Sequence, residues 1–96
     1  MIVLLIEDSK GDILLIDSAF EELGTAYELT VKENGKEALE YIIEAETGKA
    51  RLPNLIILDL NLPLINGFEV LEQIKLSKSL KDTPVIIFSS SSAEKD

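Results

Sequence analysis

The segment LIILDLNLP at residues 55–63 decides the fold of this 96-residue chain. Residues 55–58 form a continuous apolar run, which without polar alternation is typical of a strand buried on both faces of a parallel sheet. The run stops at Asp59, and Pro63 prevents the following turn from continuing as a helix or a strand. The segment therefore predicts a buried strand that ends on an acidic turn.

Three other segments predict strands of the same sheet. The run at residues 2–6 is apolar and rich in β-branched side chains, and the run at residues 85–88, directly after Pro84, is wholly apolar. Both predict buried strands. Residues 27–31 alternate between apolar and polar side chains, which predicts a strand nearer to an edge of the sheet.

Between these strands, apolar residues recur three or four positions apart, as they do on one face of a helix. The predicted helices run from about residue 12 to 23 with Gly24 as C-cap, from Asn34-Gly35 to Gly48, and from Asn66-Gly67 onward. The apolar residues at this spacing are Ile13, Ile16, Phe20 and Leu23 in the first helix, Ala38, Leu39, Ile42 and Ile43 on one face of the second, and Phe68, Val70, Leu71, Ile74 and Leu76 in the third.

The order of the elements is βαβαβαβ with short links. Right-handed crossovers then place helices on both faces, so we predict an α/β fold with a doubly wound parallel sheet. The length and an apolar content of 46% fit one compact domain over residues 1–96.

The composition restricts the chemistry and the partners of the chain. It contains no cysteine and no histidine, so a bound metal would be a hard cation held by oxygen atoms, such as Mg²⁺ or Ca²⁺. The net charge of −9 disfavours direct binding to nucleic acids or anionic membranes. The apolar runs are too short to cross a bilayer and no signal peptide is recognisable, so we expect a cytoplasmic protein.

Polar residues follow three of the predicted strands. Glu7 and Asp8 come directly after the first strand, Asp59 after the third, and Ser89 and Ser90 after the fourth. Because the carboxyl ends of parallel strands lie along one edge of a sheet, we expect these side chains to meet there. Clustered carboxylates repel one another unless a cation such as Mg²⁺ lies between them.

This arrangement favours phosphoryl transfer, which needs charge neutralisation and an acceptor oxygen in line with the leaving group. Asp59, beside a metal at an exposed strand end, would be the nucleophile. The hydroxyl of Ser89 could then donate a hydrogen bond to a phosphoryl oxygen.

Each of these residues also has an ordinary interpretation. Asp8 or Asp12 could cap the first helix, and Asp59 could be a solvated turn residue. Residues 61–63 alone indicate a turn, and Ser89 alone indicates a strand end. The functional interpretation depends on the combination of acids and a hydroxyl at one edge.

Four segments in this order resemble the receiver domains of response regulators in two-component signalling, which have a CheY-like, flavodoxin-like fold. They are VLLIEDS at residues 3–9, IILDLNLP at residues 56–63, Asn66-Gly67, and PVIIFS at residues 84–89. The resemblance covers essentially the whole chain and implies the strand order 2-1-3-4. The link at residues 48–53 and the ending at residues 85–91 are most similar to single-domain regulators of the phytochrome type.

The resemblance implies a role for each residue at the predicted edge. Asp59 would accept a phosphoryl group from a histidine kinase or a phosphotransfer protein. Asp8 would bind Mg²⁺ directly, Glu7 chiefly through a water molecule, and Asn61 through its backbone carbonyl. Ser89 would be the switch hydroxyl, with Ser90 as the small residue beside it. Such a domain assists its own phosphorylation and dephosphorylation and is not an enzyme acting on other substrates.

Receiver domains continue through a fourth helix, a fifth strand with a switch aromatic, a lysine and a fifth helix. We therefore expect an incomplete receiver domain, in which the fifth strand, the last helices and that lysine are missing. The strand at residues 85–88 would then be an unpaired apolar edge, through which two chains could form a homo-oligomer. We also expect weak Mg²⁺ binding and poor phosphorylation of such a chain.

Two other functions are open at this point. A phosphatase with an aspartyl nucleophile would need a second acid two residues after Asp59, and that position holds Asn61. A non-phosphorylated structural or interaction fragment would leave the acidic edge unused, which the presence of Glu7, Asp8 and Asp59 together disfavours.

Overall fold

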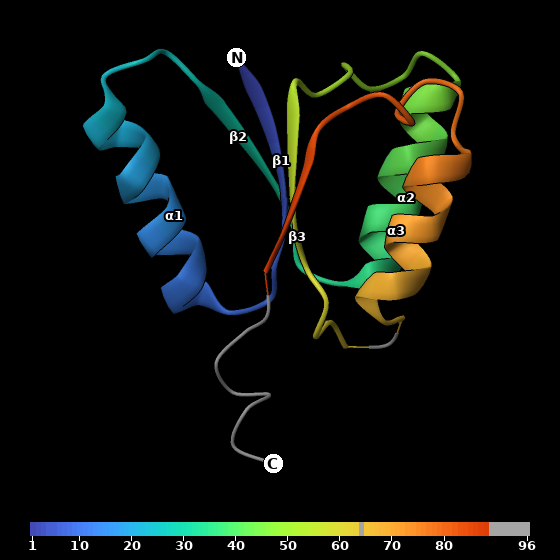
Figure 1. Ribbon diagram of the computed structural model, residues 1–96, viewed down its shortest axis with the longest axis horizontal. Helices are drawn as coiled ribbons and strands as arrows, with labels where there is room; N and C mark the ends of the chain where they lie inside the picture. The colour runs from blue at the N-terminus through green and yellow to red at the C-terminus, as the bar shows by residue number, and fades with distance from the viewer. Residues whose placement is uncertain (64, 89–96) are drawn as a thin grey trace.

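The computed structural model describes residues 1–63 and 65–88, in which four strands and three helices alternate (Figure 1). The elements are β1 (Ile2–Ile6), α1 (Lys10–Leu23), β2 (Glu28–Lys32), α2 (Gly35–Glu46), β3 (Leu55–Asp59), α3 (Gly67–Leu76) and β4 (Val85–Phe88). The strands form one parallel sheet in the order β2-β1-β3-β4, with α1 on one face and α2 and α3 on the other. The predicted doubly wound α/β fold and its strand order are confirmed.

The inner strands β1 and β3 carry the core, which explains why their sequences do not alternate. Val3 and Leu5 are buried beneath α1, whereas Leu4 and Ile6 point to the opposite face and pack with α2 and α3. Each fully buried aliphatic side chain of this kind contributes about 1.5–3 kcal/mol to stability. The two faces of the inner strands therefore fix the position of the sheet between its helix layers.

Each helix begins directly after a side chain that caps it. Ser9, Asn34 and Asn66 have extended backbones, and each accepts a hydrogen bond from the backbone N–H three residues later. The alternative that Asp8 or Asp12 caps α1 is therefore wrong. Ser9 has the capping conformation, and the N–H of Asp12 is its donor.

A glycine with a left-handed backbone caps α1, as the sequence predicted, and a second one follows Thr47, the C-cap of α2. Gly24 caps α1 with φ 73°, and Gly48 follows α2 with φ 80°. Only glycine adopts this conformation without a steric penalty from Cβ.

None of the helices within the described residues is long and apolar enough to span a membrane.

Several of the regularly spaced apolar residues of the helices are exposed. Ile43, Phe68 and Leu76 are 62%, 65% and 69% exposed, and Leu23 is exposed as well. In α2 the buried positions near Ile43 are taken by Tyr41 and Ala45. The apolar stripe on these helices is wider than the part of the sheet that they cover, so its outer positions face solvent.

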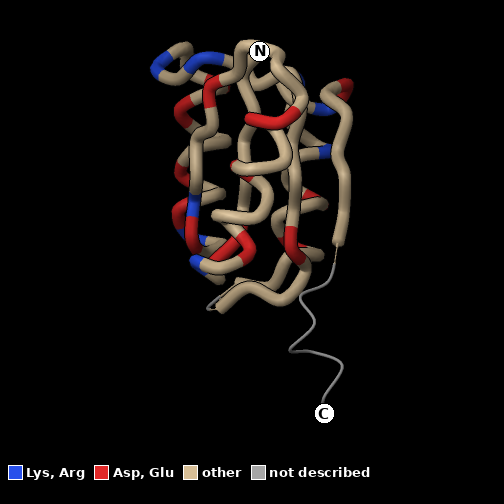
Figure 2. The backbone as a smooth tube through the Cα atoms, turned by 90° about the vertical axis from the view of Figure 1, so that its left-hand side faces the viewer, with Lys and Arg blue, Asp and Glu red and all other residues tan. Residues whose placement is uncertain are grey.

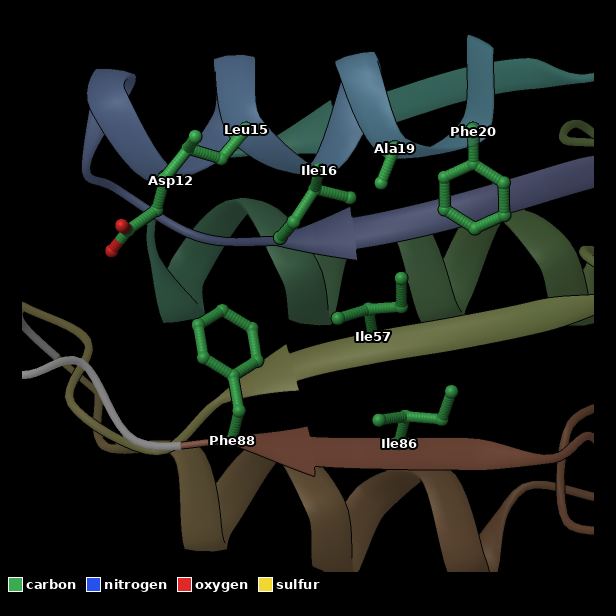
Figure 3. Close-up of a pocket in the computed structure, with 8 residues that line it drawn as sticks. All are labelled: Asp12, Leu15, Ile16, Ala19, Phe20, Ile57, Ile86 and Phe88. Carbon is green, nitrogen blue, oxygen red and sulfur yellow. The ribbon is translucent and has the colours of Figure 1, made fainter. Parts of the chain in front are cut away.

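The prediction that β4 is a buried strand is wrong, because β4 lies at one side of the sheet that the described residues form and none of its residues is buried. β4 pairs with β3 alone among the described residues, and Ile86 and Ile87 are largely exposed. Beside it lies an apolar hollow of about 370 Å³, across which Figure 3 shows side chains of α1, including Phe20, facing Ile57 and Phe88. Association of two chains through this edge stays a prediction.

Candidate functional site

The predicted acidic cluster lies at the carboxyl ends of β1 and β3, the lower end of the sheet in Figure 1. The two strands are neighbours, and their register pairs Ile6 with Leu58. The next residues in each chain segment are Glu7 and Asp59, which the ladder therefore brings side by side. One carboxylate oxygen from each of Glu7, Asp8 and Asp59 lies within 4.8 Å of the others.

Glu7 is completely buried at the start of the link to α1. Its Oε2 accepts a hydrogen bond of 2.8 Å from the backbone N–H of Ser9, whereas its Oε1 has no hydrogen-bond partner among the described residues. Burying a carboxylate oxygen without a partner costs several kcal/mol. A ligand at Oε1 would remove this cost, which makes the cluster a candidate cation site.

Asp59 is the last residue of β3 and not the first residue after it, and it is completely buried. Its Oδ1 accepts a hydrogen bond of 2.9 Å from the backbone N–H of Asn61, which turns the chain sharply after the strand. The interpretation of Asp59 as a solvated turn residue, and the expectation of an exposed strand end, are therefore wrong. Asp8, in contrast, is exposed and forms the solvent side of the cluster.

Gly67 fixes the position of the link that follows Asp59. Its N–H donates to the carbonyl of Leu60 at 3.1 Å. A Cβ atom at this position would lie 2.5 Å from Leu60 Cα and 2.7 Å from the Asp59 carbonyl oxygen. Only glycine allows the start of α3 to approach the end of β3 this closely.

Burial changes the protonation of Glu7. Its pKa is raised from 4.5 to about 7, chiefly because burial disfavours the charged form. The hydrogen bond from the Ser9 N–H lowers the pKa, and the negative charge of Asp59 raises it further. Between these two pKa values the folded chain keeps a proton that the unfolded chain has lost. In the absence of divalent cations, the free energy of unfolding therefore falls as the pH rises from 4.5 to 7.

We expect this loss of stability to be about 2–3 kcal/mol in the wild type, and we expect Glu7→Gln, which cannot titrate at this position, not to show it. Urea unfolding of both proteins in EDTA, followed by circular dichroism across this pH range, measures the difference. Glu22→Gln, at an exposed position of α1, is the control and should behave as the wild type. A pH dependence shared by the wild type and Glu7→Gln would contradict the assignment.

The donor set fits a hard divalent cation. The cluster offers only carboxylate oxygens, two of its three carboxylates are buried, and one buried oxygen has no partner among the described residues. Mg²⁺ is bound in proteins by one or two carboxylates together with water and phosphate oxygens. The three acidic residues could therefore hold such an ion.

The other predicted site residues are Asn61, Ser89 and Ser90. Asn61 contributes its N–H to Asp59, while a role of its carbonyl as a metal ligand stays a prediction. Ser89 and Ser90 lie outside the described residues. The sequence interpretation missed Ser9, although a serine three residues before Asp12 at the start of a helix is a known capping signal.

Comparison with known families gives a match to the response regulator receiver domain over residues 3–96. The probable methanogenesis regulatory protein FilR2 of Methanothrix harundinacea is 41% identical over 95 residues, and response regulator Rcp1 of Synechocystis is 38% identical over 96 residues. Each alignment covers 99% of this chain, which spans 61% of the length of FilR2 and 65% of the length of Rcp1.

Solved structures of such regulators have the same fold. The Mn²⁺-bound form of Rcp1 superimposes with a TM-score of 0.85 at 38% identity, and the phosphorylated cyanobacterial phytochrome response regulator RcpA with 0.81 at 40%. Both alignments cover 99% of this chain and 69% of the other. The resemblance to regulators of the phytochrome type is thereby confirmed.

Proposed function

The chain belongs to the response regulator receiver domain family, and from this we propose that its Asp59 accepts a phosphoryl group from a histidine kinase or a phosphotransfer protein. The main support is the position of Asp59, buried at the end of β3 with carboxylates of Glu7 and Asp8 within 4.8 Å. The relative RcpA has been solved in a phosphorylated form.

In the proposed reaction, a carboxylate oxygen of Asp59 attacks the phosphorus atom of a phosphohistidine. A new P–O bond forms to Asp59 while the P–N bond breaks, and its electron pair remains on the imidazole nitrogen, which takes up a proton. Later attack of water on the phosphorus atom releases phosphate and restores the carboxylate. The chain thus assists its own phosphorylation and dephosphorylation, and no separate substrate is turned over.

Mg²⁺ is the cofactor that we propose for this site. Asp8 and Asp59 would hold it directly, Glu7 chiefly through water, and Asn61 through its carbonyl oxygen. When bound, the ion supplies the positive charge that offsets the carboxylates and the phosphoryl oxygens. Ser89 would donate a hydrogen bond to the phosphoryl group, with Ser90 as the small neighbour.

The contribution of Asp8 to metal binding is directly measurable. Asp8→Asn removes one negative charge from an exposed position and leaves the buried carboxylates unchanged, so we expect Mg²⁺ to bind roughly tenfold more weakly. Isothermal titration calorimetry with MgCl₂ measures the affinity. Asp82→Asn, a change of equal charge at an exposed turn, is the control and should bind Mg²⁺ as the wild type does. Equal affinities of all three proteins would exclude Asp8 as a ligand.

We also propose that the chain is located in the cytoplasm and does not bind nucleic acids directly. Receiver domains are in general signalling domains. The expected cytoplasmic location is supported by the proposed phosphodonor, a histidine kinase. The chain's net charge of −9 supports the expectation that it does not bind nucleic acids directly.

A further inference from the structure

A furrow runs between α2 and α3 on the face of the molecule away from the sheet. It consists of two adjoining hollows of about 210 Å³ and 220 Å³, which share Ile42, Ile43 and Gln73. One end lies beside Glu69 and the other beside Leu76. The two helices contact each other on the same face of the sheet (Figure 1), and the lining residues show that the furrow follows their length.

Apolar side chains line the furrow, and two of them do not belong to the core. Ile43 from α2 and Leu76 from α3 lie against it and are 62% and 69% exposed. Ile42 forms its floor and is almost fully buried. Large apolar side chains gathered at one place on a surface mark a site of interaction more often than the same residues scattered singly.

The charged side chains that line the furrow are all acidic, while Lys78 lies near enough to Glu46 to help lower its pKa. Glu69 and Glu72 line the first hollow and Glu46 the second, and none of the described residues that line either hollow is basic. Glu46 accepts hydrogen bonds from the hydroxyl of Ser77 and the N–H of Ser79, which lower its pKa and keep it ionised.

These features select one kind of occupant. A groove between helices with an apolar floor accepts the apolar face of an amphipathic helix, and an acidic rim favours lysine or arginine beside that face. A second copy of this chain is disfavoured because it carries 18 acidic and 9 basic residues. Figure 2, which views the molecule from the α1 side, opposite the furrow, shows acidic positions spread over that face too, with few basic positions to attract the furrow of another copy.

We propose that the α2–α3 furrow is a docking site for a basic amphipathic helix of a partner protein. The furrow lies on the helix face and not at the carboxyl edge of the sheet. This inference goes beyond the proposed phosphorylation, and it does not depend on Asp59 as the phosphoacceptor.

The experiment uses a fluorescent helical peptide of about 18 leucine and lysine residues with the leucines on one face. Titration of this peptide with the full chain measures affinity by anisotropy, and amide NMR spectra of the chain locate the contact. We expect saturable binding, with resonance changes centred on residues 39–46 and 69–77. A peptide of the same composition, shuffled to break the apolar face, should bind much more weakly.

Variants separate docking in the furrow from general attraction to an acidic protein. Ile43→Ser combined with Leu76→Ser should weaken binding roughly tenfold or more, whereas Leu15→Ser combined with Leu23→Ser, equally exposed on α1, should not. Glu72→Lys should weaken binding more than Glu22→Lys on α1, although both change the net charge equally. Circular dichroism verifies that the variants are folded.

Three results would overturn the proposal. They are resonance changes centred on α1 and β4, equal weakening by the matched variants, and no binding at millimolar peptide in low salt. Loss of Mg²⁺ binding or of phosphorylation at Asp59 would instead bear only on the proposed function.

Discussion

Asp59→Asn is expected to reduce Mg²⁺-dependent labelling by a phosphodonor at least about 100-fold, because the carboxamide lacks the nucleophilic oxygen that the reaction needs. Asparagine has nearly the same shape, and its carbonyl oxygen can still accept the hydrogen bond that Asp59 receives from the Asn61 N–H. A loss of labelling would therefore report on chemistry and not on a collapsed fold. Incubation with ³²P-labelled acetyl phosphate, in this chain or in a longer protein that contains it, measures the effect.

The controls address where the label is attached. Asp82→Asn removes an exposed aspartate far along the sequence and should label as the wild type does. Labelling that requires Mg²⁺ and is lost in hydroxylamine is the behaviour of an acyl phosphate. Label retained by Asp59→Asn at another residue would show that Asp59 is not the acceptor.

Gly67→Ala should lower the free energy of unfolding by about 2–3 kcal/mol. The added methyl group would be too close to backbone atoms, so the backbone and not a flexible side chain would have to move. The added Cβ would meet Leu60 Cα at 2.5 Å and the Asp59 carbonyl oxygen at 2.7 Å. The contact can be relieved only by moving α3 away from the end of β3. Since Asp59 is the residue at that end, Mg²⁺ affinity should fall together with stability.

Gly11→Ala is the matched control for this change. An added Cβ at Gly11 would meet only Ser9 Oγ, at 3.9 Å, and alanine has the higher helix propensity. Its stability should equal or slightly exceed that of the wild type in urea unfolding followed by circular dichroism. If Gly67→Ala had wild-type stability, the start of α3 would not approach the backbone of Asp59 and Leu60 as closely as in the structure.

The fold was predictable because the two inner strands have continuous apolar sequences, although the same pattern at residues 85–88 belongs to a strand that is not buried among the described residues. The runs at residues 2–6 and 55–58 have no polar residue. Continuous apolar sequences of this kind are typical of strands that helices cover on both faces. Once these runs are neighbours in a parallel sheet, Glu7 and Asp59 must lie side by side, as the register of β1 and β3 shows. The meeting of the acidic residues therefore followed from the order of the elements.

The environment of those acids was not predictable from their positions. Glu7 and Asp59 are buried because the start of α1 and the link to α3 close over them, through the hydrogen bonds from Ser9 and Asn61. These contacts depend on tertiary packing, which sequence spacing does not specify. For the same reason, helical periodicity placed Ile43 and Leu76 on an apolar stripe but could not show that the stripe extends beyond the sheet.

Diffraction from crystals of the chain grown with MnCl₂ would show where a divalent cation binds. We expect an anomalous difference peak at the carboxyl edge of the sheet, roughly 2.0–2.3 Å from carboxylate oxygens of Asp8 and Asp59. A manganese ion bound elsewhere on the acidic surface, with none between these two residues, would contradict the proposal that the carboxylates at the ends of β1 and β3 form one metal site.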